Sequence, residues 1–263
     1  MSNNEKNISN VFEKDILIVS KKIPSELVEV YLDTKKVCEK HKRSVSNVYN
    51  SVLLRDCYNE PTTENIQSCE IEVVNEDVLV VAEKYKDFVP AVLNLADNWV
   101  PGGLVVRGAM AQEEELFRRT NCFLSIEQHM YPLQNTRIIY TQKVKVIKDL
   151  QYTLLKTPFN ISMISASAIS NPILEKNGDL NSYDYDLTLE TLKCVFKSAI
   201  MHKKDCLVLG AFGCGEYNNP PLQIIEIFNE LLRIYRGYFQ KVVFAVYSKN
   251  DDNFELFDKH IWR

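Results

Sequence analysis

Two short segments contain most of the residues that could carry out chemistry. The first, residues 94–115, joins two adjacent glycines, Gly102 and Gly103, to Gln112 and a run of three glutamates. Glycines let backbone N–H groups approach an anion closely, and a following helix adds its positive N-terminal end. A carboxylic acid placed there can protonate a departing oxygen while a carboxylate activates water, which is the chemistry of glycosidic-bond cleavage. The segment therefore predicts a site for an anionic sugar.

The three glutamates also have a structural interpretation. Acidic residues in a first helical turn complement the helix dipole, and Glu115 precedes Arg119 by four residues, a favourable spacing for an ion pair. Consecutive helical residues point about 100° apart, so Glu113, Glu114 and Glu115 cannot all share one direction. Two neighbouring carboxylates at the mouth of a helix can still flank one sugar, one holding a hydroxyl and the other transferring a proton.

The second segment, residues 207–221, has the pattern of a strand, a glycine loop and a helix start. Its order G-x-x-G-x-G differs from the dinucleotide-binding G-x-G-x-x-G, and no Gly-Lys-Ser/Thr follows as in a P-loop. Its loop amides and helix N-terminus suit a phosphate, although such a turn can equally be a tight connection. Cys214 has no histidine near it in sequence, which favours packing of a small residue over a nucleophile.

These two segments need a scaffold that brings strand ends and helix starts together. From residue 70 onward, β-branched runs alternate with stretches long enough for crossovers, as is typical of an α/β domain. Pro220 and Pro221 favour a helix start, because a first-turn proline needs no intrahelical partner for its missing N–H. We expect helices at residues 25–43, 112–123, 183–202 and 221–235, and an apolar run at 16–19. We expect strands at residues 71–74, 78–82 or part of it, 91–95, 137–146, 161–166, 206–209 and 242–247.

Composition and charge restrict the class of protein. The 263 residues are 46% apolar and 25% charged with a net charge of -4, which excludes a disordered chain and argues against general nucleic-acid binding. No apolar run reaches the roughly 18 residues of a membrane span. The basic end of the first helical region could be a localisation or nucleic-acid patch, but a solvated helix face is favoured. Its basic residues are Lys35, Lys36, Lys40, His41, Lys42 and Arg43.

The seven cysteines indicate the compartment and argue against a metal. They are scattered without a C-x-x-C pair, and no histidine neighbours one at zinc-ligand spacing. We therefore expect reduced thiols in an intracellular protein, without resolving cytoplasm from nucleus, and we expect no bound metal or cofactor.

Taken together, the two segments resemble the bacterial-type, or microbial, poly(ADP-ribose) glycohydrolases, a branch of the macrodomain superfamily. That family's signature is three glycines, a short spacer and then Gln-Glu-Glu, and here Gly102-Gly103-Leu104 is followed by Gln112-Glu113-Glu114. The similarity runs from about residue 45 to the C-terminus. Further stretches similar to the family are residues 74–77, 139–141, 164–168, 210–215 and 242–247.

The resemblance implies an α/β fold of the macrodomain type. This is a three-layer α/β/α sandwich with a mixed, mainly parallel central sheet and a ligand cleft at the strand ends. Residues 46–263 would form that poly(ADP-ribose) glycohydrolase domain, and residues 1–45 would be an N-terminal extension that is partly helical.

The resemblance also implies roles for individual residues. Glu114 matches the catalytic acid/base, and Glu113 matches the carboxylate that holds ribose hydroxyls. Tyr247 is a weaker match, for stacking on adenine, and an aromatic residue at a buried strand end is an equally good interpretation. The other residues implied to bind the ligand are Gln112, which would orient the loop; Asn94 and Tyr217, near the distal ribose; Gly102 and Gly103; and Gly210, Gly213, Cys214 and Gly215, in the diphosphate loop.

Leu104 departs from the family pattern, since it replaces the third glycine. A positive φ there would cost a leucine about 1–2 kcal/mol, and its side chain could enter the space next to the ligand. The expected activity is hydrolysis of the ribose–ribose bond in ADP-ribose polymers. Alternatives are a hydrolase that removes single ADP-ribose units, a non-catalytic ADP-ribose reader in which Leu104 closes the catalytic approach, and a nucleotide-binding regulator unrelated to ADP-ribose.

Overall fold

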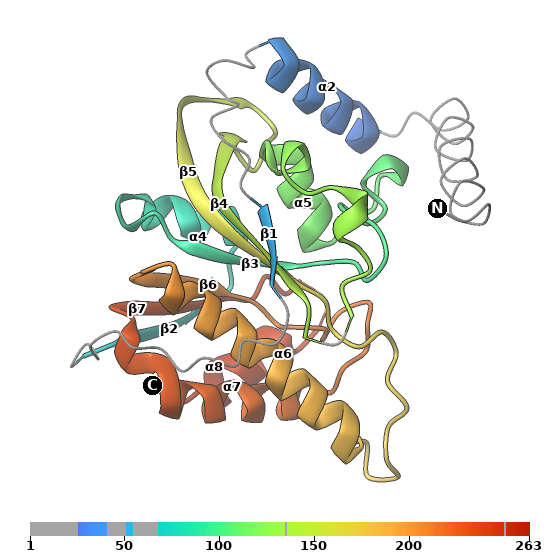
Figure 1. The fold of residues 1–263 in the computed structure, drawn as a ribbon, viewed down its shortest axis with the longest axis vertical. Helices are drawn as coiled ribbons and strands as arrows, with labels where there is room; N and C mark the ends of the chain where they lie inside the picture. Colours follow the sequence, from blue (N-terminus) through green and yellow to red (C-terminus); the bar gives the residue numbers. More distant parts are fainter. Residues whose placement is uncertain (1–25, 41–50, 55–67, 135, 250) are drawn as a thin grey trace.

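The protein is built around one mixed β-sheet (Figure 1). The computed structural model describes residues 26–40, 51–54, 68–134, 136–249 and 251–263. Its strands are β1 (Ser51–Leu54), β2 (Glu70–Val74), β3 (Ala91–Leu95), β4 (Ile138–Lys148), β5 (Leu154–Ala166), β6 (Cys206–Leu209) and β7 (Lys241–Ala245). They are arranged in the order β1-β4-β5-β3-β6-β7-β2. β4 runs antiparallel to β1 and β5, and the strands from β5 to β2 are parallel to one another.

Helices cover both faces of this sheet (Figure 1). On one face lie α2 (Glu26–Lys40), α4 (Val78–Lys84) and α5 (Gln112–Arg119), and on the other lie α6 (Ser182–Met201), α7 (Pro221–Tyr235) and α8 (Asn253–His260). Short 3-10 turns are η1 (Lys86–Phe88), η2 (Val105–Arg107), η3 (Cys122–Leu124), η4 (Gln128–Met130) and η5 (Arg236–Tyr238). The expected three-layer α/β/α class with a mainly parallel sheet is confirmed.

The central strands are buried on both faces, which explains their nearly continuous apolar sequences. Along β3, Val92 packs into the core under α4 and α5, whereas Leu93 packs into the core under α6 and α7. The alternation follows from the two-residue period of a strand. Asn94, in the same strand, is a buried polar residue in this otherwise apolar run.

The expected strand at residues 78–82 is wrong, since this segment is helix α4. Asp77 begins the helix by accepting hydrogen bonds from the N–H groups of Leu79 and Val80, both at 3.0 Å. Val78, Leu79, Val81 and Ala82 are buried, a spacing that places them on one side of a helix. The cap and this apolar face outweigh the preference of β-branched residues for strands.

The helix expected at residues 112–123 ends earlier, at Arg119. Thr120 adopts an extended backbone and bridges to Val146 of β4, and residues 122–124 form the separate turn η3. Pairing with the sheet therefore ends the helix. The remaining described elements agree with expectation to within a few residues, except that β5 begins earlier, at Leu154, and that α8 and β1 were not expected.

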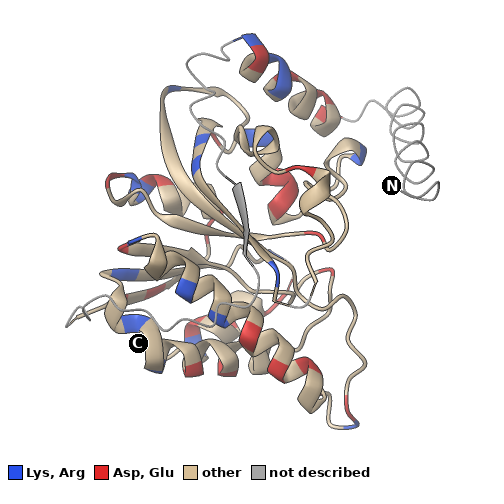
Figure 2. Cartoon of the chain, in the orientation of Figure 1, with Lys and Arg blue, Asp and Glu red and all other residues tan. Residues whose placement is uncertain are grey.

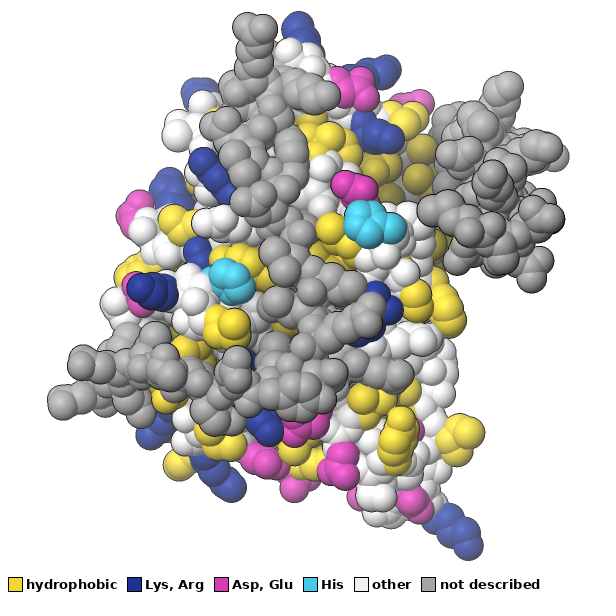
Figure 3. All heavy atoms as spheres, in the orientation of Figure 1, with side chains coloured by type: hydrophobic (Ala, Val, Ile, Leu, Met, Phe, Trp, Pro, Cys, Tyr) yellow, Lys and Arg dark blue, Asp and Glu magenta, His cyan; other side chains and the backbone are white. Residues whose placement is uncertain are grey.

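Charges of both signs are distributed over the described surface. Figure 2 shows the acidic start and the basic end of α5, and Figure 3 shows acidic and basic side chains interspersed on the visible face. Lys36 and Lys40 of α2 are exposed, as a solvated helix face requires. Residues 16–19 and 41–43 lie outside the described part of the chain. None of the described helices is long and apolar enough to cross a bilayer.

Candidate active site

The site lies where two neighbouring strands separate. Within the described residues, β3 pairs with β6 only through Ala91 and Val92. The next backbone groups on that side of β3, the C=O of Leu93 and the N–H of Leu95, are bonded instead by the side chain of Gln112, at 2.7 and 2.8 Å. In open α/β sheets, ligands bind in crevices outside the carboxyl ends of the strands. Gln112 therefore anchors the start of α5 beside such an opening.

Gly102 and Gly103 form the turn against which the site carboxylates rest. Both glycines have positive φ, +81° and +51°. A Cβ atom on Gly103 would lie 2.7 Å from Oε1 of Glu114 and 3.4 Å from Oε2 of Glu113. The two adjacent glutamates in the first turn of α5 thus converge on one glycine, and a side chain there would occupy the space that the carboxylates use.

Glu114 is held at this turn by the backbone of the next residue. Its side chain is buried, and Oε1 accepts a hydrogen bond from the N–H of Leu104 at 2.9 Å. The residue also lies in the first turn of α5, next to Glu113. The carboxyl group is therefore oriented before any ligand binds.

Glu113 is buried more deeply than Glu114, and its carboxyl group accepts hydrogen bonds from β3 and from the turn that follows β3. Oε1 accepts from the side-chain amide of Asn94 at 3.1 Å, and Oε2 accepts from the N–H of Asp97 at 2.7 Å. Burial raises the pKa of Glu113 to about 8, against these hydrogen bonds, which favour the carboxylate. Near neutral pH this group therefore carries a proton.

The raised pKa predicts a pH dependence of stability. The carboxyl group of Glu113 titrates near 4.5 in an unfolded chain and near 8 in the folded protein. Between these values the folded state binds more protons, so the free energy of unfolding should fall as pH rises and level off above the folded pKa. We expect denaturant unfolding from about pH 5 to about pH 9 to show this fall in the native protein and not in Glu113→Gln. Parallel curves for the two proteins would contradict the assignment.

The backbone strain expected at Leu104 is wrong. Leu104 has a φ of −99° and a ψ of 29°, outside the left-handed region. The positive φ angles of this turn fall instead on the glycines at 102, 103 and 108, where they cost little. The Leu104 side chain is half exposed, and its backbone N–H is the group that contacts Glu114.

Glu115 points away from the other two glutamates. Its Oε1 accepts from Nη1 of Arg118 at 2.7 Å and from the hydroxyl of Tyr152 at 2.9 Å. The expected ion pair with Arg119 is wrong, because Arg119 faces α4 and pairs with Asp77 at 2.8 Å. Glu115 is therefore part of the packing around α5.

The second glycine loop, between β6 and α7, is shaped by Gly213 and Asn219. Gly213 has a φ of +73°, and a Cβ there would lie 2.6 Å from Cβ of Ala168. The buried side-chain amide of Asn219 donates to the carbonyl of Ile169 at 2.7 Å and to that of Gly213 at 3.2 Å. These contacts fasten the loop to the segment that follows β5.

The other predicted residues of this loop differ in their surroundings. A Cβ on Gly210 would make an ordinary contact with the carbonyl oxygen of Ala245 at 3.5 Å. At Gly215 nothing described lies within 4 Å of the Cβ position, so the loop is open there. Burial raises the pKa of the Cys214 thiol, which disfavours the nucleophilic thiolate and agrees with a packing role.

Tyr217 joins the two glycine segments. Its hydroxyl donates to Oδ2 of Asp97 at 3.2 Å, across 120 residues of sequence, and accepts from the N–H of Asn98 at 3.1 Å. The side chain of Asn98 also donates to the carbonyl of Ala168 at 3.4 Å, next to Gly213. Burial and the nearby Asp97 raise the pKa of Tyr217 to about 12, so the hydroxyl remains a donor. The two glycine segments therefore meet beyond the carboxyl ends of β3 and β6.

Tyr247 is exposed beyond the end of β7. Its side chain is 53% exposed, and Nζ of Lys249 lies 5.1 Å from the ring centroid. The interpretation as an aromatic residue at a buried strand end is therefore wrong, because the strand stops at Ala245. Stacking of Tyr247 on a base stays a prediction.

Three residues that shape the site were not expected from the sequence. Asp97 accepts from two N–H groups of the following turn, at 2.7 and 2.9 Å, and bonds Glu113 through its own amide. The hydroxyl of Ser165 accepts from Asn94 at 3.0 Å, and Asn219 holds the second loop. An Asp or Asn within two residues of a strand end or a helix start is a turn signal that could have identified Asp97 and Asn219.

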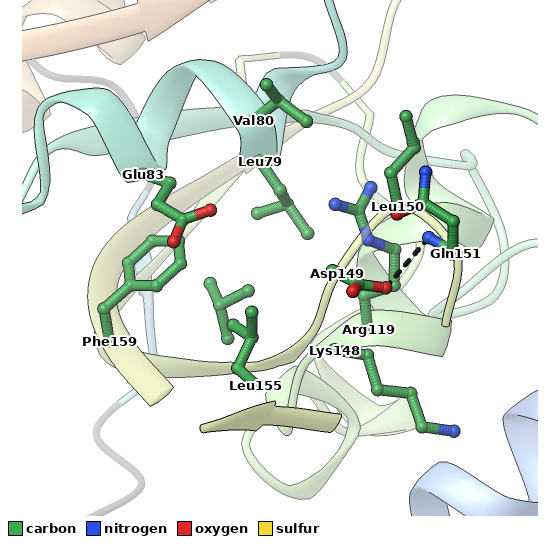
Figure 4. Close-up of a pocket in the computed structure, with 11 residues that line it drawn as sticks. Leu79, Val80, Glu83, Arg119, Lys148, Asp149, Leu150, Gln151, Leu155 and Phe159 are labelled. Atoms are coloured by element: carbon green, nitrogen blue, oxygen red, sulfur yellow. Dashed lines mark hydrogen bonds between the residues drawn. The ribbon is translucent and has the colours of Figure 1, made fainter. Parts of the chain in front are cut away.

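A cavity of about 270 Å³ lies elsewhere, between α4 and the β4–β5 hairpin (Figure 4). Leu79, Leu155 and Phe159 are among the apolar residues of its walls, and Glu83 and Asp149 contribute carboxylates. No residue that the sequence predicted for the site lines this cavity. Among the described residues, no group of three or more His, Cys, Asp or Glu side chains could hold a metal ion.

A known protein family matches the part of the chain that contains the two site glutamates. The sequence profile described as microbial-type PARG, catalytic domain, matches residues 26–149, which include the glutamates and the first glycine segment. The resemblance to the microbial-type poly(ADP-ribose) glycohydrolases is confirmed. The similarity was expected to begin at about residue 45. The PARG match begins earlier, at residue 26, which is the first residue of α2.

Solved PARG structures share the fold beyond the matched segment. The poly(ADP-ribose) glycohydrolase of Thermomonospora curvata is similar with a TM-score of 0.76 and 24% identity, over 89% of this chain and 98% of that chain. The same enzyme bound to the inhibitor ADP-HPD gives 0.77 and 25% over the same shares. The Deinococcus radiodurans enzyme in complex with ADP-ribose gives 0.66 and 26%, over 74% and 84%. A comparison with curated protein sequences found no match.

Proposed function

We propose that the protein is a poly(ADP-ribose) glycohydrolase that releases ADP-ribose by hydrolysing ribose–ribose O-glycosidic bonds. The observation that carries this proposal is the convergence of Glu113 and Glu114 on Gly103, beside a second glycine loop. The PARG profile, and the PARG structures with ADP-ribose or an inhibitor bound, support the same activity. Its partners would be macromolecules that carry ADP-ribose or its polymers.

Glu114 is the acid/base in this reaction. As the carboxylic acid, it donates its proton to the ribose oxygen that leaves with the rest of the polymer, while the glycosidic C–O bond breaks and an oxocarbenium-like centre forms. The resulting carboxylate then takes a proton from the water that attacks this centre, so Glu114 returns to its starting state. The hydrogen bond from Leu104 keeps the carboxyl group oriented through both steps.

The neighbouring groups bind the rest of the ligand. Glu113 holds ribose hydroxyls, and because burial raises its pKa it can donate as well as accept a hydrogen bond near neutral pH. Backbone N–H groups of the loop at residues 210–215 bind the diphosphate, except that of Cys214, which donates to the carbonyl of Ala211 at 3.1 Å. The absence of neighbours at the Cβ position of Gly215 among the described residues leaves room for the ligand. Tyr217 keeps this loop against the strand end that carries Glu113's partners.

Incubation of the purified protein with poly(ADP-ribose) tests the proposal. We expect free ADP-ribose as the product and a shortened polymer. A parallel incubation with a protein that carries single ADP-ribose units tests the alternative mono-ADP-ribosyl hydrolase, because the two reactions differ in the leaving group. Release from that substrate alone would overturn the polymer activity. Binding of ADP-ribose by calorimetry without product from either substrate would indicate a reader, for which two buried carboxyl groups have no evident use.

A further inference from the structure

We propose that Arg118 is a positioning residue for Glu113 and Glu114, and that α2 holds Arg118 in place. The inference rests on the proposed function, since it assigns a role in that reaction. It starts from burial: the side chain of Arg118 is 0% exposed, although a guanidinium is permanently charged. A buried charge of this kind is tolerated only when several hydrogen bonds compensate for lost hydration.

The guanidinium of Arg118 bonds three separate pieces of the protein. Nη1 donates to Glu115 of the same helix at 2.7 Å, and Nη2 donates to the carbonyl of Ala109. Nε donates to the carbonyl of Leu27 in α2 at 3.4 Å. One side chain thus connects α5, the segment that enters α5, and the N-terminal helix.

The entering segment leads directly to the site. Ala109 donates its N–H to the carbonyl of Leu104 at 3.3 Å, and the N–H of Leu104 bonds Glu114 at 2.9 Å. The residue that begins α5, Ala111, has no side-chain hydrogen bond to the first turn. Because the N-cap residue supplies no bond, the start of α5 is held by the bonds of Gln112 to β3 and by the bond of Arg118 to Ala109, and the second of these fixes the segment that leads to Leu104.

Further contacts join α2 to Arg118 and to the neighbouring part of the domain. The hydroxyl of Thr34 donates to the backbone carbonyl of Arg118, and the ring of Tyr31 packs edge-on against Phe123. A second buried cation, Lys148 of β4, donates to Asp33 at 2.7 Å and to the carbonyl of Val30 at 3.2 Å. Figure 4 shows the Lys148 side chain pointing away from the cavity. Lys148 therefore holds α2 without the bond to Ala109 that distinguishes Arg118.

This difference gives a matched pair of variants, Arg118→Met and Lys148→Met. Each removes one buried cation that bonds α2. We expect Arg118→Met to lower kcat on poly(ADP-ribose) by about tenfold or more with KM changed by less than about threefold, and Lys148→Met to leave kcat within about threefold. Arg118→Lys keeps the charge but reaches fewer acceptors, so its kcat should lie between the native value and that of Arg118→Met.

Hydrogen exchange provides a readout that needs no substrate. The N–H groups of Leu104 and Asp97 bond Glu114 and Glu113, so their exchange rates report how firmly the carboxyl groups are held. We expect Arg118→Met to accelerate both by about tenfold and Lys148→Met to change them by less than about threefold. The Tm of each variant shows whether the two are comparably destabilised.

Two outcomes would overturn the inference. One is an unchanged kcat and unchanged exchange in Arg118→Met, and the other is equal effects of Arg118→Met and Lys148→Met at equal loss of Tm, which would indicate general destabilisation. If Arg118→Met does not fold, Arg118→Lys takes its place in both comparisons. Should the native protein release no ADP-ribose, the proposed function fails, while the exchange rates at Leu104 and Asp97 still test the role of Arg118.

Discussion

Release of ADP-ribose by the Glu114→Gln variant is expected to fall by about 10²- to 10⁴-fold, the usual contribution of a positioned acid/base. Glutamine has the shape of glutamate, and its carbonyl oxygen can still accept the N–H of Leu104, so the turn at Gly103 should persist. What is lost is the proton that the leaving ribose oxygen needs. Product release from poly(ADP-ribose) measures the loss, and calorimetry with ADP-ribose should show that binding remains.

A carboxylate outside the site is the control for this experiment. Glu190 lies on α6 and pairs with Lys193 at 3.0 Å on an exposed surface. Glu190→Gln removes the same charge and should leave turnover at the native level. Native turnover in Glu114→Gln would refute Glu114 as the acid/base, and a loss of ADP-ribose binding would show that the residue acts in binding instead.

Gly103→Ala is expected to lower kcat by about 10²-fold or more, because small displacements of reacting groups are costly in enzymes. The added methyl group would lie 2.7 Å from Oε1 of Glu114, too close for any Cβ, so the carboxyl group must move. The positive φ of +51° at this residue adds backbone strain of about 1–2 kcal/mol. Steady-state kinetics and thermal unfolding of the variant measure the two effects separately.

Gly178→Ala separates backbone strain from displacement of the carboxyl group. Gly178 also has a positive φ, +89°, but nothing described lies within 4 Å of its Cβ position. We expect both alanine variants to lose stability and only Gly103→Ala to lose activity. Comparable kcat values for the two variants would mean that the turn at Gly103 does not need its close approach to Glu114.

Local features of the sequence determined many of the elements and the identity of the motifs. Pro221 begins α7 at the expected residue, and the β-branched run at residues 206–209 is strand β6. The spacing of glycines and glutamates was sufficient to indicate the PARG family. The turn at Gly102 and Gly103 and the start of α5 each need specific residue types at specific positions, and these can be read along the chain. The division at residue 45 stays a prediction, and the contacts of α2 with α5 support treating this helix together with the domain that follows.

Tertiary structure decided what each of these residues does. Residues 78–82 form a helix because Asp77 caps them and one side of the helix packs into the core, and Leu104 avoids strain because neighbouring glycines adopt the positive φ angles. The raised pKa of Glu113 and the bond from Tyr217 to Asp97 both depend on contacts with distant segments. Spacing along the chain encodes local backbone preferences, whereas burial and long-range hydrogen bonds exist only once packing has brought those segments together.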